Sequence, residues 1–373
     1  MRRRAPRTWR WWAPQVALLI ALGLAFAWFG VNLVRNLMQR GIMTGFDFLA
    51  SAARFPISET ILPYASNDSL GWAFIVGTAN TAFLTVSILL LSTLFGLPLA
   101  LARRSGHPLA KHLSGSIIEL VRNTPLVVQL LFWYGLITVS LPTSRHALQP
   151  LSGFFLTDRG LYFTSFGITG TVLPLLLLAS GGLILIAALA WHGRLHLASL
   201  ATLATVLACG ATWVALDLGV APDTPQLGRF NFTGGVTLTP EFVAVMVGST
   251  LYASAFAAEI IRGGIDAVAR GQWEAGAALG LTERQCLRLV IMPQALRVMI
   301  PPMTNQFISI LKNSTIALVV GYPELNFIAN TAMNHSGQAI EAIAILILVF
   351  LGTAGLIAYA MNRLNARVAL VER

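Results

Sequence analysis

Residues 69–102 read SLGWAFIVGTANTAFLTVSILLLSTLFGLPLALA, a stretch without a single Asp, Glu, Lys or Arg. About 20 apolar residues cross the hydrocarbon core of a bilayer as a helix. Comparable runs lie at 13–34, 123–144, 160–193, 195–216, 242–258 and 342–362, and an eighth, 298–321, is interrupted only by Lys312. Because lipid offers the backbone no hydrogen-bond partner, the sequence predicts an all-α polytopic membrane protein with about eight transmembrane helices.

The composition supports a bilayer rather than water as the solvent. Of the 373 residues, 56% are hydrophobic and 11% are charged, whereas soluble domains carry about 25% charged residues. The net charge of +10 does not come with the basic patches and interleaved aromatics that read nucleic acid. Lys and Arg instead gather beside the apolar runs, as they do at the cytoplasmic ends of membrane helices.

The distribution of basic residues also predicts the orientation. A basic cluster precedes the first run and places the N-terminus in the cytoplasm; it consists of Arg2, Arg3, Arg4, Arg7 and Arg10. Eight spans then return the C-terminus to the cytoplasm. Cys209 and Cys286 fall in different compartments, so neither a disulfide nor a metal site is expected. The run 13–34 is about twice as long as a signal-peptide core, and we interpret it as a retained anchor.

One polar loop differs from the other, shorter connections. Residues 262–297 read RGGIDAVARGQWEAGAALGLTERQCLRLVIMPQALR. Good helix formers from Gln272 to Leu279 are followed by Gly280, which suits a left-handed helix end. Thr282 and Gln285 form a capping-box pattern that starts a second helix, and Pro293 is expected to end it. A cytoplasmic helix–Gly–helix element of this size, too short to be a domain, is expected to dock onto a partner.

The same loop resembles a known family. Glu274-Ala275-Gly276, then Gly280, then a stretch ending at Pro293 keep the spacing of the EAA signature of ABC importer permeases, with Gly276, Val290 and Met292 as departures. The alternative is an ordinary amphipathic loop. The resemblance implies that Glu274, Ala275, Gly276, Gly280 and Pro293 form the surface that couples the chain to a separate ATPase.

Other stretches are similar to the HisM-type permeases of polar amino-acid importers. These are 119–129, 258–265 and 311–325, and the resemblance extends over about 70–135 and 240–365. It implies a five-helix type I core in two parts, 69–145 and 241–373, preceded by a segment 1–68 and interrupted by an inserted helix pair in 146–240. That enlarged layout resembles the permease subunit of general L-amino-acid importers, the AapM/BztC-like type.

The family implies the partners and the location. A second homologous permease subunit, a dimeric cytoplasmic ABC ATPase and a periplasmic amino-acid-binding protein complete such importers in the bacterial inner membrane. The sequence contains no G-x-x-x-x-G-K-[ST] motif, so no cofactor is expected here and the partner ATPase is expected to bind ATP. Neither a catalytic residue nor a metal ligand is expected.

Three groups of polar residues lie within or beside the apolar runs. Asn305, Ser309 and Lys312 share one helix face by their spacing, which must avoid lipid because an unpaired charge there costs roughly 2.5–3.5 kcal/mol. They either line the translocation path and meet a substrate carboxylate, or Lys312 forms a structural ion pair with Glu259 or Glu119.

Pro125 breaks the helix pattern near a span end and frees a carbonyl. Thr124 either satisfies the disturbed backbone or contacts substrate, and Gln129, one turn further on, is a candidate pocket residue. Glu259 and Arg262 are spaced to form a local salt bridge that positions the loop 262–297.

Two rival functions make different predictions. A secondary transporter driven by an ion gradient predicts inverted repeats with matching broken helices, which this sequence lacks. An intramembrane enzyme requires convergent polar groups at membrane depth, whereas the six His residues are scattered near loops. The secondary amino-acid transporter is the alternative that we keep.

Overall fold

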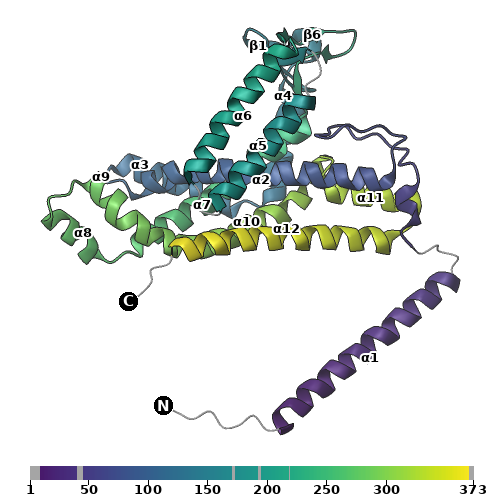
Figure 1. Ribbon diagram of the computed structural model, residues 1–373, viewed down its shortest axis with the longest axis horizontal. Coiled ribbons are helices and arrows are strands. Elements are labelled where there is room, and N and C mark those ends of the chain that lie inside the picture. The colour runs from purple at the N-terminus through teal and green to yellow at the C-terminus, as the bar shows by residue number, and fades with distance from the viewer. Residues whose placement is uncertain (1–8, 40–44, 170–172, 192–194, 218, 369–373) are drawn as a thin grey trace. The chain divides into compact units, whose positions relative to one another are not determined.

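The computed structural model describes residues 9–39, 45–169, 173–191, 195–217 and 219–368 (Figure 1). The chain divides into two compact units. Unit 1 comprises 1–130 and 245–373, and unit 2 comprises 131–244. The described residues are mostly helical, which confirms the expected fold class.

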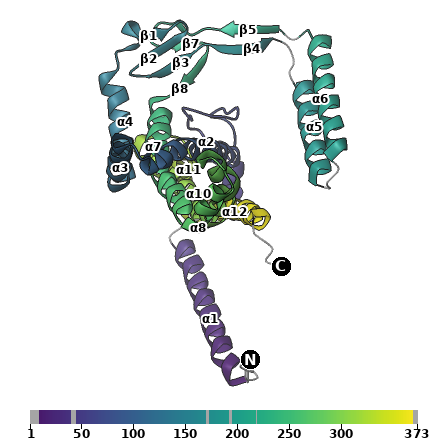
Figure 2. The same ribbon diagram turned by 90° about the vertical axis from the view of Figure 1, so that its left-hand side faces the viewer.

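Unit 1 is built on long apolar helices. Helices α2, α10 and α12 run side by side, and α3 packs against α2 (Figures 1 and 2). The α-helices of this unit are α1 (Trp9–Gln39), α2 (Leu70–Arg104), α3 (Pro108–Asn123), α7 (Pro240–Asp266, which begins in unit 2), α8 (Arg270–Ala278), α9 (Glu283–Cys286), α10 (Met292–Asn313), α11 (Leu325–Ser336) and α12 (Ala339–Val368). Shorter turns are the 3-10 helices η1 (Asp47–Ala50) and η4 (Ser314–Val320) and the π-helical η3 (Leu287–Ile291).

Unit 2 combines short strands with a helix pair. It contains most of α4 (Leu126–Ser140), η2 (Ser144–His146), and the hairpin of α5 (Leu173–Trp191) and α6 (Leu195–Ala215), which pack on each other. Four antiparallel strands form a sheet in the order β1 (Leu148–Leu151), β2 (Phe154–Thr157), β3 (Gly160–Phe163) and β8 (Val236–Leu238). Two ribbons pair β4 (Ser165–Thr169) with β5 (Gly219–Asp223), and β6 (Gln226–Leu227) with β7 (Phe232–Thr233).

The strands correct one expectation. The run 160–193 is free of charge and was expected to be one helix, but its first ten residues form β3 and β4. In β3 the side chains alternate between the two faces, so that Tyr162 is fully buried, and Phe163 stacks on Phe154 at 4.4 Å between ring centroids. Lack of charge alone does not distinguish such aromatic strands from a membrane helix.

A second correction concerns 103–144. Residues 108–123, expected to be part of a cytoplasmic segment, form α3, and the expected span 123–144 is broken at Thr124–Pro125 between α3 and α4. The two helices are bent by 102° at this break. Within the described part of the chain, five helices are long and apolar enough to cross a membrane (α1, α2, α6, α7 and α12), or six when α3 and α4 count as one span. The number eight therefore stays a prediction.

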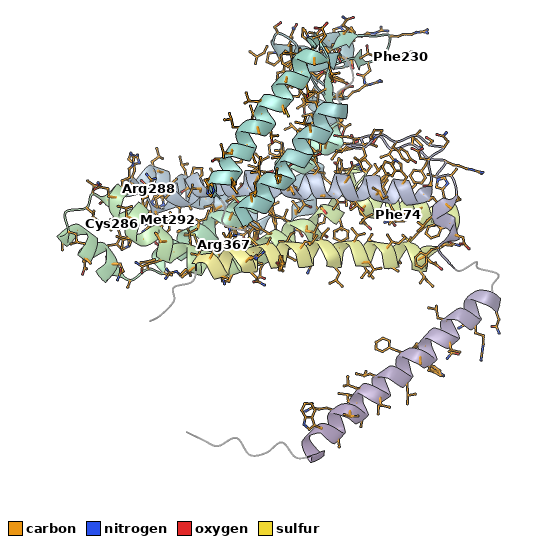
Figure 3. All side chains as sticks on the ribbon, viewed as in Figure 1. Phe74, Phe230, Cys286, Arg288, Met292 and Arg367 are labelled. Carbon is orange, nitrogen blue, oxygen red and sulfur yellow. The ribbon has the colours of Figure 1, made fainter. Side chains whose placement is uncertain are left out.

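Buried polar groups fasten α2 to its neighbours at the end far from Arg104. Asn80 is fully buried; its side chain donates to the carbonyls of Glu59 and Pro323 and accepts from the amide of Ile61. Nearby, the Glu324 carboxylate caps α11 through the amides of Asn326 and Phe327. Burial raises the pKa of Glu324 to about 7, although these two hydrogen bonds favour the charged form. Figure 3 shows Phe74 at this end of unit 1 and Cys286 at the other.

We expect Asn80→Ala to lower the stability of the purified protein. The substitution removes the partner of the Pro323 carbonyl, whose hydrogen bond is buried, and of the part-buried Glu59 carbonyl and Ile61 amide. An unsatisfied buried group costs about 1–3 kcal/mol. Thermal unfolding in detergent measures the effect. Thr93→Ala on the same helix is the control, because the Thr93 hydroxyl only donates to the carbonyl of Leu89 one turn back. Equal melting temperatures for the two variants would contradict the role given to Asn80.

Candidate functional site

The α8–α9 hairpin, residues 270–291, has the local structure that its sequence predicts. Helix α8 ends at Ala278, and Gly280 adopts a left-handed φ of +75°, a conformation that favours glycine. Thr282 then caps α9 through a complete capping box with Gln285, whose Oε1 accepts from the Thr282 amide at 2.9 Å. Two short helices are thereby held at a fixed turn. Both the glycine end and the capping box are confirmed.

The three residues of the E-A-A position face in different directions. Glu274 and Ala275 are exposed, as is Leu279, whose side chain is 80% exposed. Gly276 is buried, and a Cβ added there would lie 2.5 Å from Sγ of Cys286. Gly276 therefore makes room for Cys286 and lets α9 pack on α8. Glu274 and Ala275 are thus exposed on α8, Leu279 is exposed directly after its last residue, and Gly276 is turned inward.

The expectation for Pro293 was wrong. Pro293 does not end the second helix; it is the second residue of α10, which continues to Asn313. The preceding π-helical turn η3 changes the hydrogen-bond spacing just before a residue that has no N–H to donate. The chain can therefore pass from the hairpin into α10 without a stop. Gln294 in the first turn of α10 also donates to Oε1 of Gln272 at 2.9 Å.

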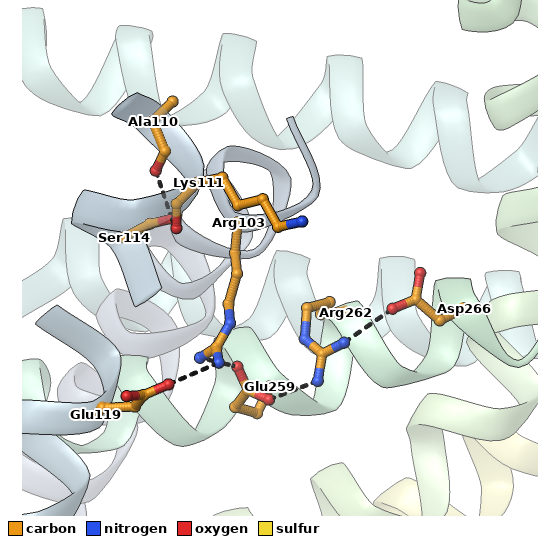
Figure 4. Close-up of polar contacts among 8 residues, drawn as sticks. All are labelled: Arg103, Ala110, Lys111, Ser114, Glu119, Glu259, Arg262 and Asp266. Carbon is orange, nitrogen blue, oxygen red and sulfur yellow. Dashed lines mark hydrogen bonds and ion pairs between the residues drawn. The ribbon is translucent and has the colours of Figure 1, made fainter. Parts of the chain in front are cut away.

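A cluster of charged residues joins α2, α3 and α7 beside this hairpin (Figure 4). Glu259 accepts from Nη1 of Arg103 at 2.7 Å and from Nη2 of Arg262 at 2.8 Å. Arg103 also reaches Glu119 on α3 at 3.0 Å, and Arg262 reaches Asp266 at 2.9 Å. The expected Glu259–Arg262 pair is thus present, but it belongs to a larger network.

A further ion pair extends the network toward the hairpin. Nε of Arg104 lies 2.7 Å from Oδ1 of Asp266, and its guanidinium lies 5.7 Å from the centroid of the Trp273 ring. Sequence reasoning missed Arg103, Arg104 and Trp273 as site residues, because the two arginines served only to orient the chain. Their place directly after the charge-free run 69–102 was the available signal.

The polar stripe on α10 consists of Asn305, Ser309 and Lys312. All three side chains are exposed in this chain, as their spacing predicts for one shared face. Among the described residues, Lys312 forms no salt bridge, and the two carboxylates considered as its partners pair with Arg103 and Arg262 instead. The ion pairs considered for Lys312 with Glu259 and with Glu119 are therefore wrong.

The residues around the α3–α4 break contact mainly the backbone. The hydroxyl of Thr124 donates to the carbonyl of Leu120 at 2.8 Å. The buried amide of Gln129 donates to the carbonyls of Val121 and Thr124 at 2.8 and 3.0 Å. These bonds satisfy carbonyls at the break that Pro125 introduces. They support the structural alternative for Thr124, and they occupy the donors of Gln129, whose role in a pocket stays a prediction.

We expect Gly276→Ala to destabilise the α8–α9 hairpin, because the new methyl group collides with Cys286. Overpacking of this kind costs about 1–3 kcal/mol, so hydrogen exchange of residues 270–291 is expected to become faster. The double variant Gly276→Ala/Cys286→Ala is expected to recover most of the protection. Gly271→Ala in the same helix is the control, since nothing lies within 4 Å of its added Cβ. Equal exchange in both single variants would contradict the packing argument.

Comparisons with known proteins agree with these features. Residues 92–368 match the family described as the binding-protein-dependent transport system inner membrane component. The chain is 38% identical to the amino-acid ABC transporter permease protein YhdX of Escherichia coli (strain K12), over 98% of this chain and 96% of that protein.

Two further relatives span nearly the whole chain. The general L-amino acid transport system permease protein AapQ of Rhizobium johnstonii is 35% identical, covering 96% of this chain and 92% of that protein. The glutamate/glutamine/aspartate/asparagine transport system permease protein BztB of Rhodobacter capsulatus is 30% identical, covering 96% and 93%. The resemblance to amino-acid ABC permeases is thereby confirmed, whereas these relatives that match over the whole chain are AapQ and BztB, not the AapM/BztC-like type expected from the layout. The chain belongs to the family of inner membrane components of binding-protein-dependent transport systems.

Proposed function

We propose that this protein is one permease subunit of an ATP-binding-cassette importer that moves polar or general L-amino acids from the periplasm into the cytoplasm. Its family and its relatives, whose names specify amino-acid transport, support this assignment. In this proposal both termini lie in the cytoplasm, on the same side as the α8–α9 hairpin. The subunit is not itself an enzyme; the energy comes from ATP bound and hydrolysed by a separate ATPase dimer.

The observation that carries the proposal is the exposed face of α8. Glu274 and Ala275 are exposed on this short helix, and Leu279, which is 80% exposed, follows its last residue; Gly280 and packing on α9 fix that end of the helix. A rigid helix with an apolar anchor fits a groove in a partner protein. We assign that groove to the ATPase. Closure of the ATPase dimer then tilts this subunit against a homologous second permease between inward-open and outward-open forms.

The same proposal assigns roles to two further segments and to the polar stripe of α10. The segments 35–70 and 217–240 face the periplasm and form part of the docking surface for an amino-acid-binding protein. The polar stripe of α10 faces the path between the two permease subunits, where an exposed Lys312 avoids lipid and can meet a substrate carboxylate. The uncovered state of Asn305, Ser309 and Lys312 in the single chain supports this role.

Uptake by the reconstituted assembly tests the transport function itself. Proteoliposomes with ATP on the ATPase side are expected to accumulate radiolabelled amino acids only when the binding protein is present on the other side. A proton gradient without ATP is expected to give no uptake. Uptake driven by the gradient after ATP is exhausted would instead support the secondary transporter.

Leu279→Asp is expected to reduce copurification of the ATPase at least tenfold, because it places a charge in the centre of an apolar contact, where a hot-spot residue is worth about 2 kcal/mol or more. Leu279→Met is the matched control, since it keeps an apolar side chain of similar size at the same position. Quantitative pull-down from membranes measures both. Equal recovery of the ATPase with the two variants would show that α8 does not carry the contact.

Lys312→Met is expected to raise the KM for uptake about tenfold or more. A hydrogen bond to a charged group contributes about 1.5–3 kcal/mol, and the variant cannot make it to a substrate carboxylate. Initial uptake rates over a range of amino-acid concentrations separate KM from kcat. Lys312→Arg, which keeps the charge, is expected to retain more of the affinity. An unchanged KM with a lower kcat would assign Lys312 a structural role.

A further inference from the structure

Arg104 connects three separate segments of unit 1. It is the last residue of α2, it pairs with Asp266 at the end of α7, and its guanidinium lies over the Trp273 ring of α8. Both contacts use one planar group, since a guanidinium can donate along its edge while it stacks on an aromatic face. The end of α2 is therefore attached both to α7 and to α8, the helix that directly precedes the exposed Leu279.

The three residues of this attachment line an open groove. Its volume is about 670 Å³, and its lining consists of Arg104, Ile265, Asp266, Val268, Arg270, Trp273 and Glu274. Polar side chains reach into this space, so α8 does not rest on a continuous apolar surface here. At such a groove, specific contacts help to fix how α8 sits relative to α2. Arg104 supplies two of them, to Asp266 on α7 and to Trp273 on α8.

The neighbouring Arg103 has a different task. It binds Glu119 on α3 and Glu259 on α7, and so it joins α2 to the other long helices. Arg104 alone of the two arginines reaches α8. At the other end of α2, Asn80 fastens the helix to the carbonyls of Glu59 and Pro323. A helix of 35 residues is about 52 Å long, so a displacement of one end can be carried to the other.

We propose that Arg104 is a positioning residue that transmits movement of α8 to α2. The inference rests on the proposed function. The chain itself connects the hairpin only to α7 and α10, so an ATPase that moves α8 acts directly on those two helices. The contacts of Arg104 with Asp266 and Trp273 add α2 to the moving group. Without them, the ATPase still docks and hydrolyses ATP, but less of its movement reaches the far end of α2.

The test uses the complete assembly with its ATPase, second permease and binding protein in proteoliposomes. Arg104→Gln is expected to keep ATPase copurification within twofold of the wild type, while the amount of amino acid imported per ATP hydrolysed falls at least threefold. Arg104→Lys keeps a cation beside Asp266 and Trp273 and is expected to recover at least half of the lost coupling ratio. Trp273→Leu is expected to lower the amount of amino acid imported per ATP hydrolysed. The double variant Arg104→Gln/Trp273→Leu is expected to import as much amino acid per ATP as Arg104→Gln alone, because both substitutions remove the same contact.

Lys111→Gln is the matched control. Lys111 is an exposed cation near the same helix ends and, within the described residues, takes part in no salt bridge (Figure 4). Its removal is expected to leave the coupling ratio unchanged. A wild-type ratio in Arg104→Gln, or an equal fall in Lys111→Gln, would overturn the inference. If Arg104→Gln does not assemble, the coupling ratios of Arg104→Lys and Trp273→Leu are used instead: a lowered ratio in Trp273→Leu supports the inference, and wild-type ratios in both variants overturn it. Failure of the wild-type assembly to import amino acids with ATP would instead reject the proposed function.

Discussion

Glu259 is the point on which the charged end of unit 1 depends. Its side chain is only 18% exposed, and its carboxylate lies between the guanidinium groups of Arg103 and Arg262. Removing one partner from such a network leaves an uncompensated charge, which is far more costly than the net gain of the intact pair. The geometry therefore favours keeping α2, α3 and α7 together at this end. The α8–α9 hairpin begins four residues beyond Asp266. The network that holds the end of α7 therefore also fixes the point from which the hairpin starts.

Helix α2 is held to its neighbours by ion pairs in one region and by neutral hydrogen bonds in another. At one end, ion pairs from Arg103 and Arg104 hold the helix to α3, α7 and α8. Ten residues after the first residue of the helix, the neutral amide of the fully buried Asn80 binds the backbone of Glu59, Ile61 and Pro323. Between them the helix is apolar. Charged groups thus stay at a helix end, where the cost of removing them from water is lowest, and neutral hydrogen bonds act in the interior.

The sequence-based predictions were correct where a feature depends on neighbouring residues, and they failed where it depends on partners far away in the sequence. Gly280 and the capping box of Thr282 depend on neighbouring residues, and the structure confirms both. The strands β3 and β4 depend on partners far along the chain, up to Leu238 and Asp223, so a charge-free run could not reveal them. The same limit applies to Arg104, whose contacts are 162 and 169 residues away in the sequence. The polar stripe on α10 was predictable because helical spacing alone defines a face.

The departure at Gly276 shows how a motif can change without losing its exposed surface. In this chain, Gly276 stands in place of the second alanine of the E-A-A pattern. A glycine weakens a helix by about 1 kcal/mol at most, so the sequence alone does not show whether the hairpin keeps its geometry. In the structure, the missing methyl group leaves the space that Sγ of Cys286 occupies. The loss in helix propensity is therefore offset by packing between α8 and α9. Since Gly276 is buried while Glu274 and Ala275 are exposed, the departure lies on the inside of the hairpin and leaves these two exposed residues of the motif unchanged.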